Sequence, residues 1–262
     1  MGDVEVTVTI IGGPTVLIEL CGVRLLTDPT FDPAGTTYER GPVHLAKTRG
    51  PAMSTAELGP LDAVLLSHDE HPDNLDAAGR ELLTRVPLVL TTPAAAKRLG
   101  GNAVGLAPGE TYDIAGPEGQ LQVVGARAEH GPPSLGPALG SVTGFLVRTR
   151  PDSAAVYISG DNVSLEAAAE ASRSGEVGLA VLHAGAARLQ PFGPAPLSMT
   201  AADAANATSL LDAGAVIVVH AEGWNHLSEP DHAVITAFAA AGLGERLHTA
   251  SPGQRVSARL RG

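Results

Sequence analysis

The sequence predicts an α/β fold, and two observations carry this prediction. Apolar runs of strand length dominate the first half of the chain, whereas such runs alternate with helical patterns in the second half. The chain has 262 residues, of which 44% are hydrophobic, so it is long enough to bury a large core. No stretch has the composition of a linker or a low-complexity tail. We therefore expect one domain that covers residues 1–262.

The first half reads mainly as strands. Gly12-Gly13-Pro14 is typical of a tight turn after the first strand, and Cys21-Gly22 is typical of a hairpin turn. The expected strands are residues 4–11, 16–20, 23–27, 63–66, 88–91 and 121–128, and the expected helices are residues 75–84 and 93–99. Residues 28–53 are rich in Pro, Gly and Thr without periodicity, which predicts a long loop. Loops of that length are more often functional than not.

The second half alternates between the two kinds of element. The expected strands are residues 142–147, 154–158, 178–182 and 215–219, and the expected helices are residues 164–172, 200–211 and 231–241. The helix at 200–211 is rich in alanine, and such apolar helices leave room for self-association into a homo-oligomer.

The composition limits the kinds of partner and site that the chain can have. Aromatic residues make up only 3% of the chain and the formal net charge is −11, which disfavours a nucleic-acid partner. A single cysteine excludes an internal disulfide framework and a thiolate-rich zinc site. No signal peptide is visible, and no apolar run reaches the roughly 18 residues of a membrane span. We expect a cytoplasmic protein that acts on a small molecule, without nucleic acid or membrane.

The most informative segment follows the apolar run at 63–66. Two imidazoles and three carboxylates stand within six residues: His68, Asp69, Glu70, His71 and Asp73. Charges placed beside a core strand must be paired, solvated or bound to a cation. Imidazole nitrogen with carboxylate oxygen, and no thiolate, suits Zn²⁺, Mn²⁺ or Fe²⁺. The segment therefore predicts the first half of a metal site.

Further polar residues stand at the ends of other predicted strands. His68, His130, His183, His220 and Asp161 each follow an apolar run. Strand ends are where a rigid sheet presents side chains to a shared cleft, so we expect these residues to converge. For His183 two interpretations stay open: it lines the cleft and donates a proton to the leaving group, or it is a hydrogen-bonded structural histidine.

The motifs follow one another in the order Ser67-His68-x-x-His71-x-Asp73, then His130, then Ser159-Gly160-Asp161, then His220. This order resembles the metallo-β-lactamase superfamily of metal-dependent hydrolases. Ile10-Ile11-Gly12-Gly13 and Leu25-Leu26-Thr27-Asp28-Pro29 resemble the branch that contains the L-ascorbate-6-phosphate lactonase. The resemblance covers about residues 4–250. It implies a four-layer αββα sandwich with the metal site at the edge where the two sheets meet.

The resemblance also implies roles for individual residues. His68, His71 and His130 would hold a first metal, Asp161 would bridge two metals, and Asp73 with His220 would hold the second. The implied cofactor is one or two divalent ions, with Zn²⁺ expected first and Mn²⁺ or Fe²⁺ as alternatives. A bound ion lowers the pKa of its water and polarises a carbonyl or phosphoryl oxygen. Asp73, Asp161 and His183 are the candidate catalytic residues.

Two departures from the family pattern bear on this site. The family motif is His-x-His-x-Asp-His, whereas this chain has one extra residue between His68 and His71. Either a bulge keeps His68 in reach, or Asp69 takes the first ligand position. Asn74 stands where the second metal would have a histidine, and its amide offers only a neutral oxygen. A second metal should then bind more weakly, or the site holds one metal.

These features together predict a metal-dependent hydrolase that acts on a small lactone, ester or phosphodiester. A nuclease of the same superfamily is disfavoured by the acidity and the scarcity of aromatics. A non-catalytic member with a degenerate metal site is the alternative, because of Asn74 and the extra residue. We expect residues 28–53 and 183–198 to line the substrate cleft. Lys47 and Arg49 are the candidates for gripping an anionic substrate, and the favoured alternative is that they form a solvated surface pair.

Overall fold

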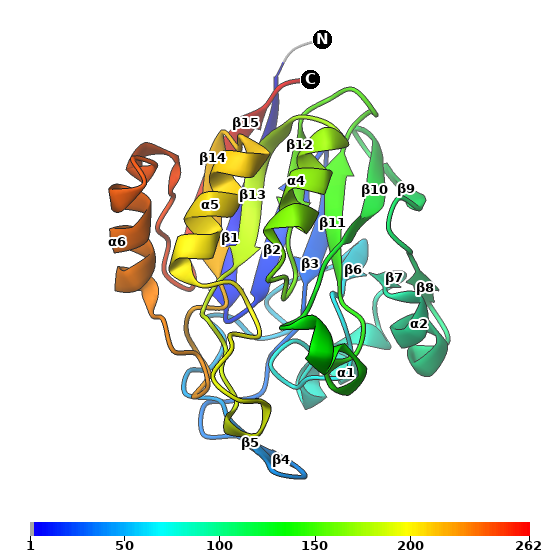
Figure 1. Cartoon of the computed structure of the whole chain (residues 1–262). Helices are drawn as coiled ribbons and strands as arrows, with labels where there is room; N and C mark the ends of the chain where they lie inside the picture. Colours follow the sequence, from blue (N-terminus) through cyan, green and yellow to red (C-terminus); the bar gives the residue numbers. More distant parts are fainter. Residues whose placement is uncertain (1–2) are drawn as a thin grey trace.

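The computed structural model describes residues 3–262, and two facing sheets form its centre (Figure 1). The first sheet has seven strands, and both ends of the chain contribute to it. Its order is β15 (Arg255–Leu260), β1 (Val4–Gly12), β2 (Thr15–Leu20), β3 (Val23–Thr27), β6 (Ala63–Leu65), β7 (Val89–Thr91) and β8 (Ala103–Gly105). Pairing is antiparallel from β15 to β3 and parallel from β3 to β8.

The second sheet has six strands and is also mixed. Its order is β14 (Ala215–Val219), β13 (Val177–His183), β12 (Ala155–Ile158), β11 (Thr143–Arg148), β10 (Gly119–Arg127) and β9 (Thr111–Gly116). Strands β12, β13 and β14 are parallel, and β11 is antiparallel to both β10 and β12. Strands β10, β12, β13 and β14 therefore all end at the same edge of this sheet.

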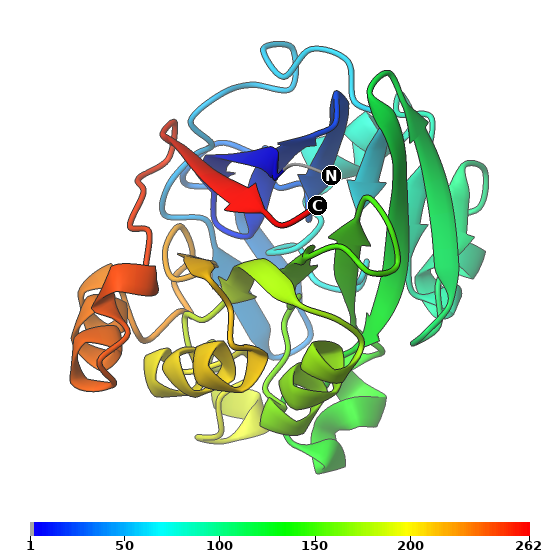
Figure 2. The same ribbon diagram turned by 90° about the horizontal axis from the view of Figure 1, so that it is seen from above.

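Helices cover the outer faces of both sheets. The helices are α1 (Ala77–Leu83), α2 (Pro93–Leu99), α3 (Gly136–Leu139), α4 (Leu165–Arg173), α5 (Ala201–Leu211) and α6 (Asp231–Ala240), with short 3₁₀ turns at Pro133–Leu135, Gln190–Phe192 and Gly244–Arg246. Figure 2 shows α4 and α5 outside the second sheet, whose other face meets the first sheet. The predicted four-layer αββα sandwich is thus confirmed.

Three apolar layers hold these elements together. Alternate residues of both sheets, such as Val8 and Val181, form the core between them. Alanines of α4 and α5 pack with the outer face of the second sheet, where small side chains let helix and sheet approach closely. A third cluster lies between the first sheet and α1 and includes Leu82 and Leu83. Burial of this area is the main stabilising contribution to the fold.

The expected loop at 28–53 is the main error in the predicted elements. It contains the hairpin of β4 (Thr37–Arg40) and β5 (Val43–Ala46), which lies below the sheets in Figure 1. Both strands are largely exposed, so they lack the apolar alternation that indicates a strand. Among residues 3–262, no helix has the length and apolar character needed to cross a membrane.

Candidate metal centre

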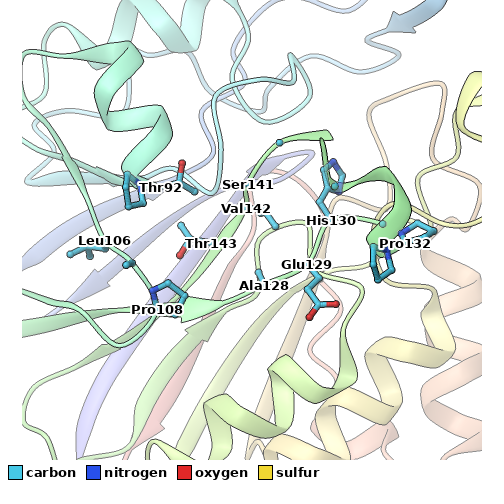
Figure 3. A pocket seen from close by; sticks show the side chains of 16 residues that line it. Thr92, Leu106, Pro108, Ala128, Glu129, His130, Pro132, Ser141, Val142 and Thr143 are labelled. Atoms are coloured by element: carbon cyan, nitrogen blue, oxygen red, sulfur yellow. The ribbon is translucent and has the colours of Figure 1, made fainter. Parts of the chain in front are cut away.

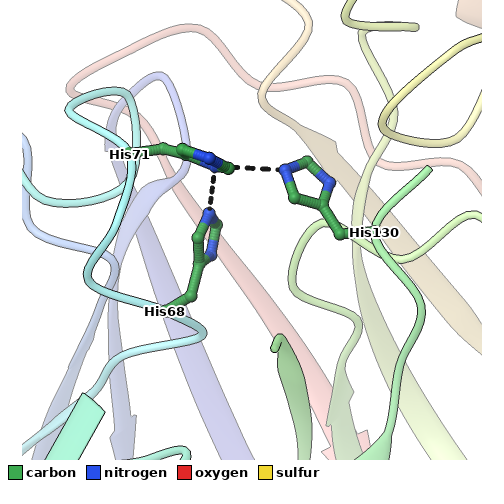
Figure 4. A group of neighbouring side chains, drawn as sticks. All are labelled: His68, His71 and His130. Carbon is green, nitrogen blue, oxygen red and sulfur yellow. Dashed lines mark hydrogen bonds between the residues drawn. The ribbon is translucent and has the colours of Figure 1, made fainter. Parts of the chain in front are cut away.

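Three histidines from two segments bring their ring nitrogens together (Figure 4). His68 and His71 lie in the turn after β6, and His130 follows β10. Nδ1 of His71 lies 2.8 Å from Nε2 of His68 and 3.1 Å from Nε2 of His130. We call these three residues the histidine triad. Three imidazoles without a carboxylate match the ligand set of a Zn²⁺ site that keeps its fourth position open.

The outward-facing nitrogens of the triad are held by neutral partners. Nδ1–H of His130 donates to the carbonyl oxygen of Leu197 at 2.6 Å, and Nδ1 of His68 is hydrogen-bonded to the hydroxyl of Ser67 at 2.9 Å. Because the Nδ1 proton of His130 is engaged outward, its Nε2 presents a lone pair to the triad. Such partners set the tautomer and the ring orientation of ligating histidines.

Two rings of the triad, those of His68 and His71, are neutral at neutral pH. Burial and the neighbouring imidazoles of His71 and His130 hold the pKa of His68 well below its usual value. Burial, followed by the charge that His130 would carry, lowers the pKa of His71 to about 4. A metal does not have to displace a proton from a neutral imidazole, so these rings are ready to ligate.

A second group consists of Asp73, His220 and His226, which we call the aspartate triad. Oδ2 of Asp73 accepts a hydrogen bond from Nε2 of His226 at 2.9 Å and lies 3.4 Å from Nε2 of His220. His220 follows β14 and has a left-handed backbone with φ of 57°, and its N–H donates to the carbonyl oxygen of Gly13. The Gly12-Gly13 turn therefore lies at the site.

Asp161 stands behind this triad. It follows β12, and its Oδ1 accepts a hydrogen bond from Nδ1 of His220 at 3.0 Å. Burial lowers the pKa of His220, but the carboxylates of Asp161 and Asp73 outweigh that effect and raise the pKa to about 10. Burial raises the pKa of Asp73, whereas His226 and His220 outweigh it and hold this pKa well below its usual value. The two carboxylates thus concentrate negative charge beside buried imidazoles.

The donor atoms of both triads fit divalent ions. Nε2 of His220 is buried and has no hydrogen-bond partner among the described residues, although it faces Asp73. Buried polar nitrogens are rarely left without a partner in a native protein, and a cation would satisfy this one. Two groups of nitrogen and oxygen ligands accommodate one ion or two, and the ligand types do not choose between Zn²⁺, Mn²⁺ and Fe²⁺.

A cavity of about 220 Å³ opens onto both triads. His71 and His130 of the histidine triad and Asp73 and His226 of the aspartate triad line its inner end. The other walls come from the β4–β5 hairpin, from α3 and from residues 187–197. Parts of the two segments expected to line the cleft, residues 38–45 and 187–197, thus line this cavity.

A wider cavity of about 510 Å³ lies on another side of His130 (Figure 3). Thr92, Leu106, Glu129 and Thr143 are among its lining residues, and His130 is the one triad member that reaches it. A reactant there would contact a single imidazole, so the smaller cavity is the better placed for chemistry at the triads.

Comparisons with known proteins agree with this architecture. A family model described as "Beta-lactamase superfamily domain" matches residues 23–221. The chain belongs to the beta-lactamase superfamily. An isothiocyanate hydrolase from Delia radicum gut bacteria superposes with a TM-score of 0.79 at 21% identity, covering 95% of this chain and 98% of that chain. A metallo hydrolase from the archaeon Ignicoccus hospitalis gives a TM-score of 0.71 at 19% identity, covering 97% and 98%. At these identities the likeness establishes the fold.

One curated relative shares a shorter stretch. The N-acyl-phosphatidylethanolamine-hydrolyzing phospholipase D 1 of Caenorhabditis elegans is 39% identical over 79 residues, which is 30% of this chain. The match spans about a fifth of the length of that relative, 21%.

The first departure from the superfamily motif is resolved by the placement of Asp69. Its carboxylate accepts hydrogen bonds from Nε of Arg98 at 3.0 and 3.2 Å, and Glu70 also contacts Arg98. Asp69 is thereby held away from the triad, while His68 reaches His71 across the extra residue. Of the two alternatives for the first position, the geometry favours His68.

The second departure is offset by a residue distant in sequence. Asn74 is buried and its amide reaches only the Ser67 hydroxyl, at 3.5 Å. His226 instead brings an imidazole to Asp73, 153 residues away along the chain. The sequence interpretation gave metal roles to six residues and omitted His226. The signal available was the run of functional residue types from His220 to His226.

Asp161 and His183 both lie beside His220. Asp161 contacts His220 and is absent from both groups of converging ligand atoms. His183 is fully buried, with Nε2 3.2 Å from Oδ2 of Asp28 and its ring 5.8 Å from that of His220. It does not line the cavity that opens onto the triads. Of its two interpretations, the geometry favours the hydrogen-bonded structural histidine.

The two basic residues considered for an anionic substrate do not reach the cavity. Lys47 is buried, and its ammonium contacts Oδ2 of Asp76 at 3.0 Å. Arg49 is exposed and contacts Glu222. Nearer carboxylates hold both cations, so Arg49 matches the favoured alternative of a solvated surface residue, whereas the buried Lys47 matches neither interpretation.

Proposed function

We propose that this chain is a metal-dependent hydrolase of the beta-lactamase superfamily, and that it acts on a small lactone, ester or phosphodiester. The observation that carries the proposal is the cavity that opens onto residues of both triads at once. A reactant held there meets imidazoles and a carboxylate together, which is the arrangement needed for hydrolysis. The names of the structural neighbours, among them an isothiocyanate hydrolase, support hydrolysis in general.

In this proposal the histidine triad holds the first ion, and the aspartate triad holds the second when two are bound. An ion bound there supplies Lewis acidity and lowers the pKa of water. Asp73 is the single carboxylate among the sixteen described residues that line the cavity. Its low pKa keeps it ionised, so it accepts a hydrogen bond from a water and orients that water toward the substrate.

Asp161 acts on a different atom. Its Oδ1 accepts a hydrogen bond from Nδ1 of His220. This bond fixes the imidazole ring and leaves Nε2 directed at Asp73. His183 and Asp28 lie beneath this pair and support the strand ends from which it projects. The resemblance of the N-terminal motifs to the ascorbate-6-phosphate lactonase branch favours a lactone among the three substrate classes.

The non-catalytic alternative rested on Asn74, and His226 weakens it by supplying an imidazole to the aspartate triad. The nuclease alternative is disfavoured by the cavity, where Arg40 is the one lysine or arginine among the described lining residues. A phosphate backbone is bound through several cationic contacts.

Elemental analysis of the purified protein tests the proposal first. We expect one or two equivalents of Zn, Mn or Fe, lost in His68→Ala and reduced in Asp161→Ala, together with hydrolysis of lactones, esters or phosphodiesters. The control is His232→Ala, an exposed histidine on α6 that should retain both metal and activity. Protein that stays empty in excess Zn²⁺ and Mn²⁺ would refute the proposal. Loaded protein without hydrolysis would leave the non-catalytic alternative.

A further inference from the structure

Apart from the residues of the two triads, the described lining of the cavity is apolar except for Tyr38 and Arg40 of the hairpin. The hairpin contributes Pro42, Val43 and Leu45, and α3 contributes Leu139. The loop after β13 completes the wall with Ala187, Leu189, Phe192 and Leu197. Some of these side chains pack together as a cluster separate from the layers that hold the sheets. Because they line the cavity, a ligand there would pack against this apolar cluster.

The described cavity lining contains few charged side chains, and its one arginine already has a hydrogen-bond partner. The lone lysine or arginine among the described lining residues is Arg40, whose guanidinium donates to the carbonyl oxygen of Glu70. Phosphate and carboxylate groups are usually bound by several cationic or bidentate donors. A phosphorylated substrate would instead find Asp73 and one exposed arginine that already has a partner. The wall selects against an anionic group remote from the reacting centre.

The volume sets the size of the group that fits. A cavity of about 150 Å³ lined by apolar side chains binds benzene, so 220 Å³ has room for a phenyl ring or an alkyl chain of roughly six to eight carbons. A sugar of similar size would bury hydroxyls against Leu189, Phe192 and Leu197, which offer them no side-chain hydrogen bonds.

We propose that the substrate is an uncharged lactone or ester with an apolar group, which fills this cavity while the carbonyl faces the two triads. The inference rests on the proposed function and narrows its substrate class. In the reaction, an oxygen–carbon bond forms from water to the carbonyl carbon and the bond to the ring or ester oxygen breaks. One water proton passes to that leaving oxygen, and the carboxylic acid releases another to solvent.

A homologous series tests the proposal on the metal-loaded protein. The substrates are δ-hexalactone, δ-octalactone, δ-decalactone and δ-dodecalactone, with 6-phosphogluconolactone as the anionic comparison. We expect kcat/KM to rise about fourfold for each added methylene until the cavity is full, because each buried methylene stabilises the bound state by a similar amount. The phosphorylated lactone should be the poorest substrate. A flat series, or preference for the phosphorylated lactone, would overturn the inference and leave the hydrolase proposal intact.

Two variants test whether the apolar lining of the cavity causes the dependence of kcat/KM on chain length. Phe192→Asp puts a charge on a half-buried side chain of the cavity and should abolish the dependence on chain length. The matched control is Leu210→Asp, at a side chain on α5 that is 45% exposed and lies away from the cavity. It should keep the dependence. If kcat/KM depended equally on chain length in both variants, the proposed role of the cavity lining would be contradicted. If Phe192→Asp does not fold, the wild-type series still tests the inference.

Binding of 4-phenylbutanol separates the two proposals, because this alcohol cannot be hydrolysed. Titration calorimetry should show that it binds wild-type protein and the Leu210→Asp control, and that Phe192→Asp binds it at least tenfold more weakly. If no lactone, ester or phosphodiester is hydrolysed, the proposed function fails, and binding of the alcohol still supports an apolar ligand in the cavity. Absence of binding to the wild type would overturn the inference.

Discussion

The two triads present similar nitrogens to the same cavity, but their surroundings differ in charge. The histidine triad consists of three imidazoles, and a hydroxyl and a backbone carbonyl bind the outer nitrogens of two of them. The aspartate triad contains one carboxylate and has another, Asp161, behind His220. The first group has no carboxylate among its own members, although Asp73 and Asp161 lie near enough to raise the pKa values of His68 and His71, whereas the second contains a carboxylate itself. The difference indicates that two ions in one cavity would be held by different means.

The largest expected effect on metal affinity comes from removing His71, whose Nδ1 faces both other rings of the histidine triad. His71→Ala removes the ring that both His68 and His130 face. Outer partners of metal ligands typically contribute 10- to 100-fold in affinity, so loss of a ligand should weaken the ion of this triad by more than about 100-fold. Titration calorimetry with Zn²⁺ measures this. The exposed His44, changed to alanine, is the control. Unchanged Zn²⁺ affinity at both sites would show that the histidine triad does not hold an ion.

The next effect distinguishes the aspartate triad from the ligand set expected from the sequence. His226→Ala should lower the metal stoichiometry by one equivalent and leave the histidine triad loaded. The reason is that His226 is hydrogen-bonded to Asp73 and to no residue of the histidine triad. Elemental analysis after dialysis measures the stoichiometry. If the variant retains the wild-type metal content, Asp73, His220 and Asp161 suffice for the second ion.

Sequence reasoning found most of the strands because their signal is local. The runs at 154–158 and 215–219 correspond closely to β12 and β14, and the histidines and aspartate after such runs do lie at one sheet edge. The hairpin at 37–46 had no such signal, since distant contacts hold it. Ala46 N–H donates to the side chain of Asn225, and Lys47 pairs with Trp224 as an isolated bridge. Strand β15 likewise depends on β1, some 250 residues away.

The candidate site was predicted only as far as family motifs reach. The order of His68, His71 and His130 indicated a cluster, and these three rings do lie together. The substitution at Asn74 predicted a weaker second site, because the compensating His226 comes from a loop whose course no local pattern specifies. A single sequence gives no measure of which distant side chain fills a gap left by another.

A smaller effect tests the charge behind the aspartate triad. Asp161→Asn keeps an oxygen that accepts from Nδ1 of His220 but removes the negative charge. We expect metal affinity at the aspartate triad to fall by about 10- to 100-fold, with the histidine triad unchanged. Zn²⁺ titration resolves the two sites. An equal loss at both would mean that Asp161 bridges two ions, as the family resemblance implied.

The smallest effect tests the neutral partner of the histidine triad. Ser67→Ala removes the hydroxyl that holds Nδ1 of His68. A typical hydrogen bond contributes about 1 kcal/mol, so the affinity of this triad should fall about fivefold. Ser172→Ala, on α4 and remote from the site, is the control. A loss as large as that of Asp161→Asn would show that charge is not what separates the two triads.

The hydrogen bond from His130 to Leu197 joins an ion ligand to the wall of the cavity. A ligand that shifts residues 187–197 therefore also shifts an imidazole of the histidine triad. Thermodynamic reciprocity then requires that the ion change the affinity for the cavity ligand by the same factor as the ligand changes the affinity for the ion. Occupancy of the metal site and the shape of the cavity are thus coupled, and the carbonyl of Leu197 carries this coupling into the loop after β13.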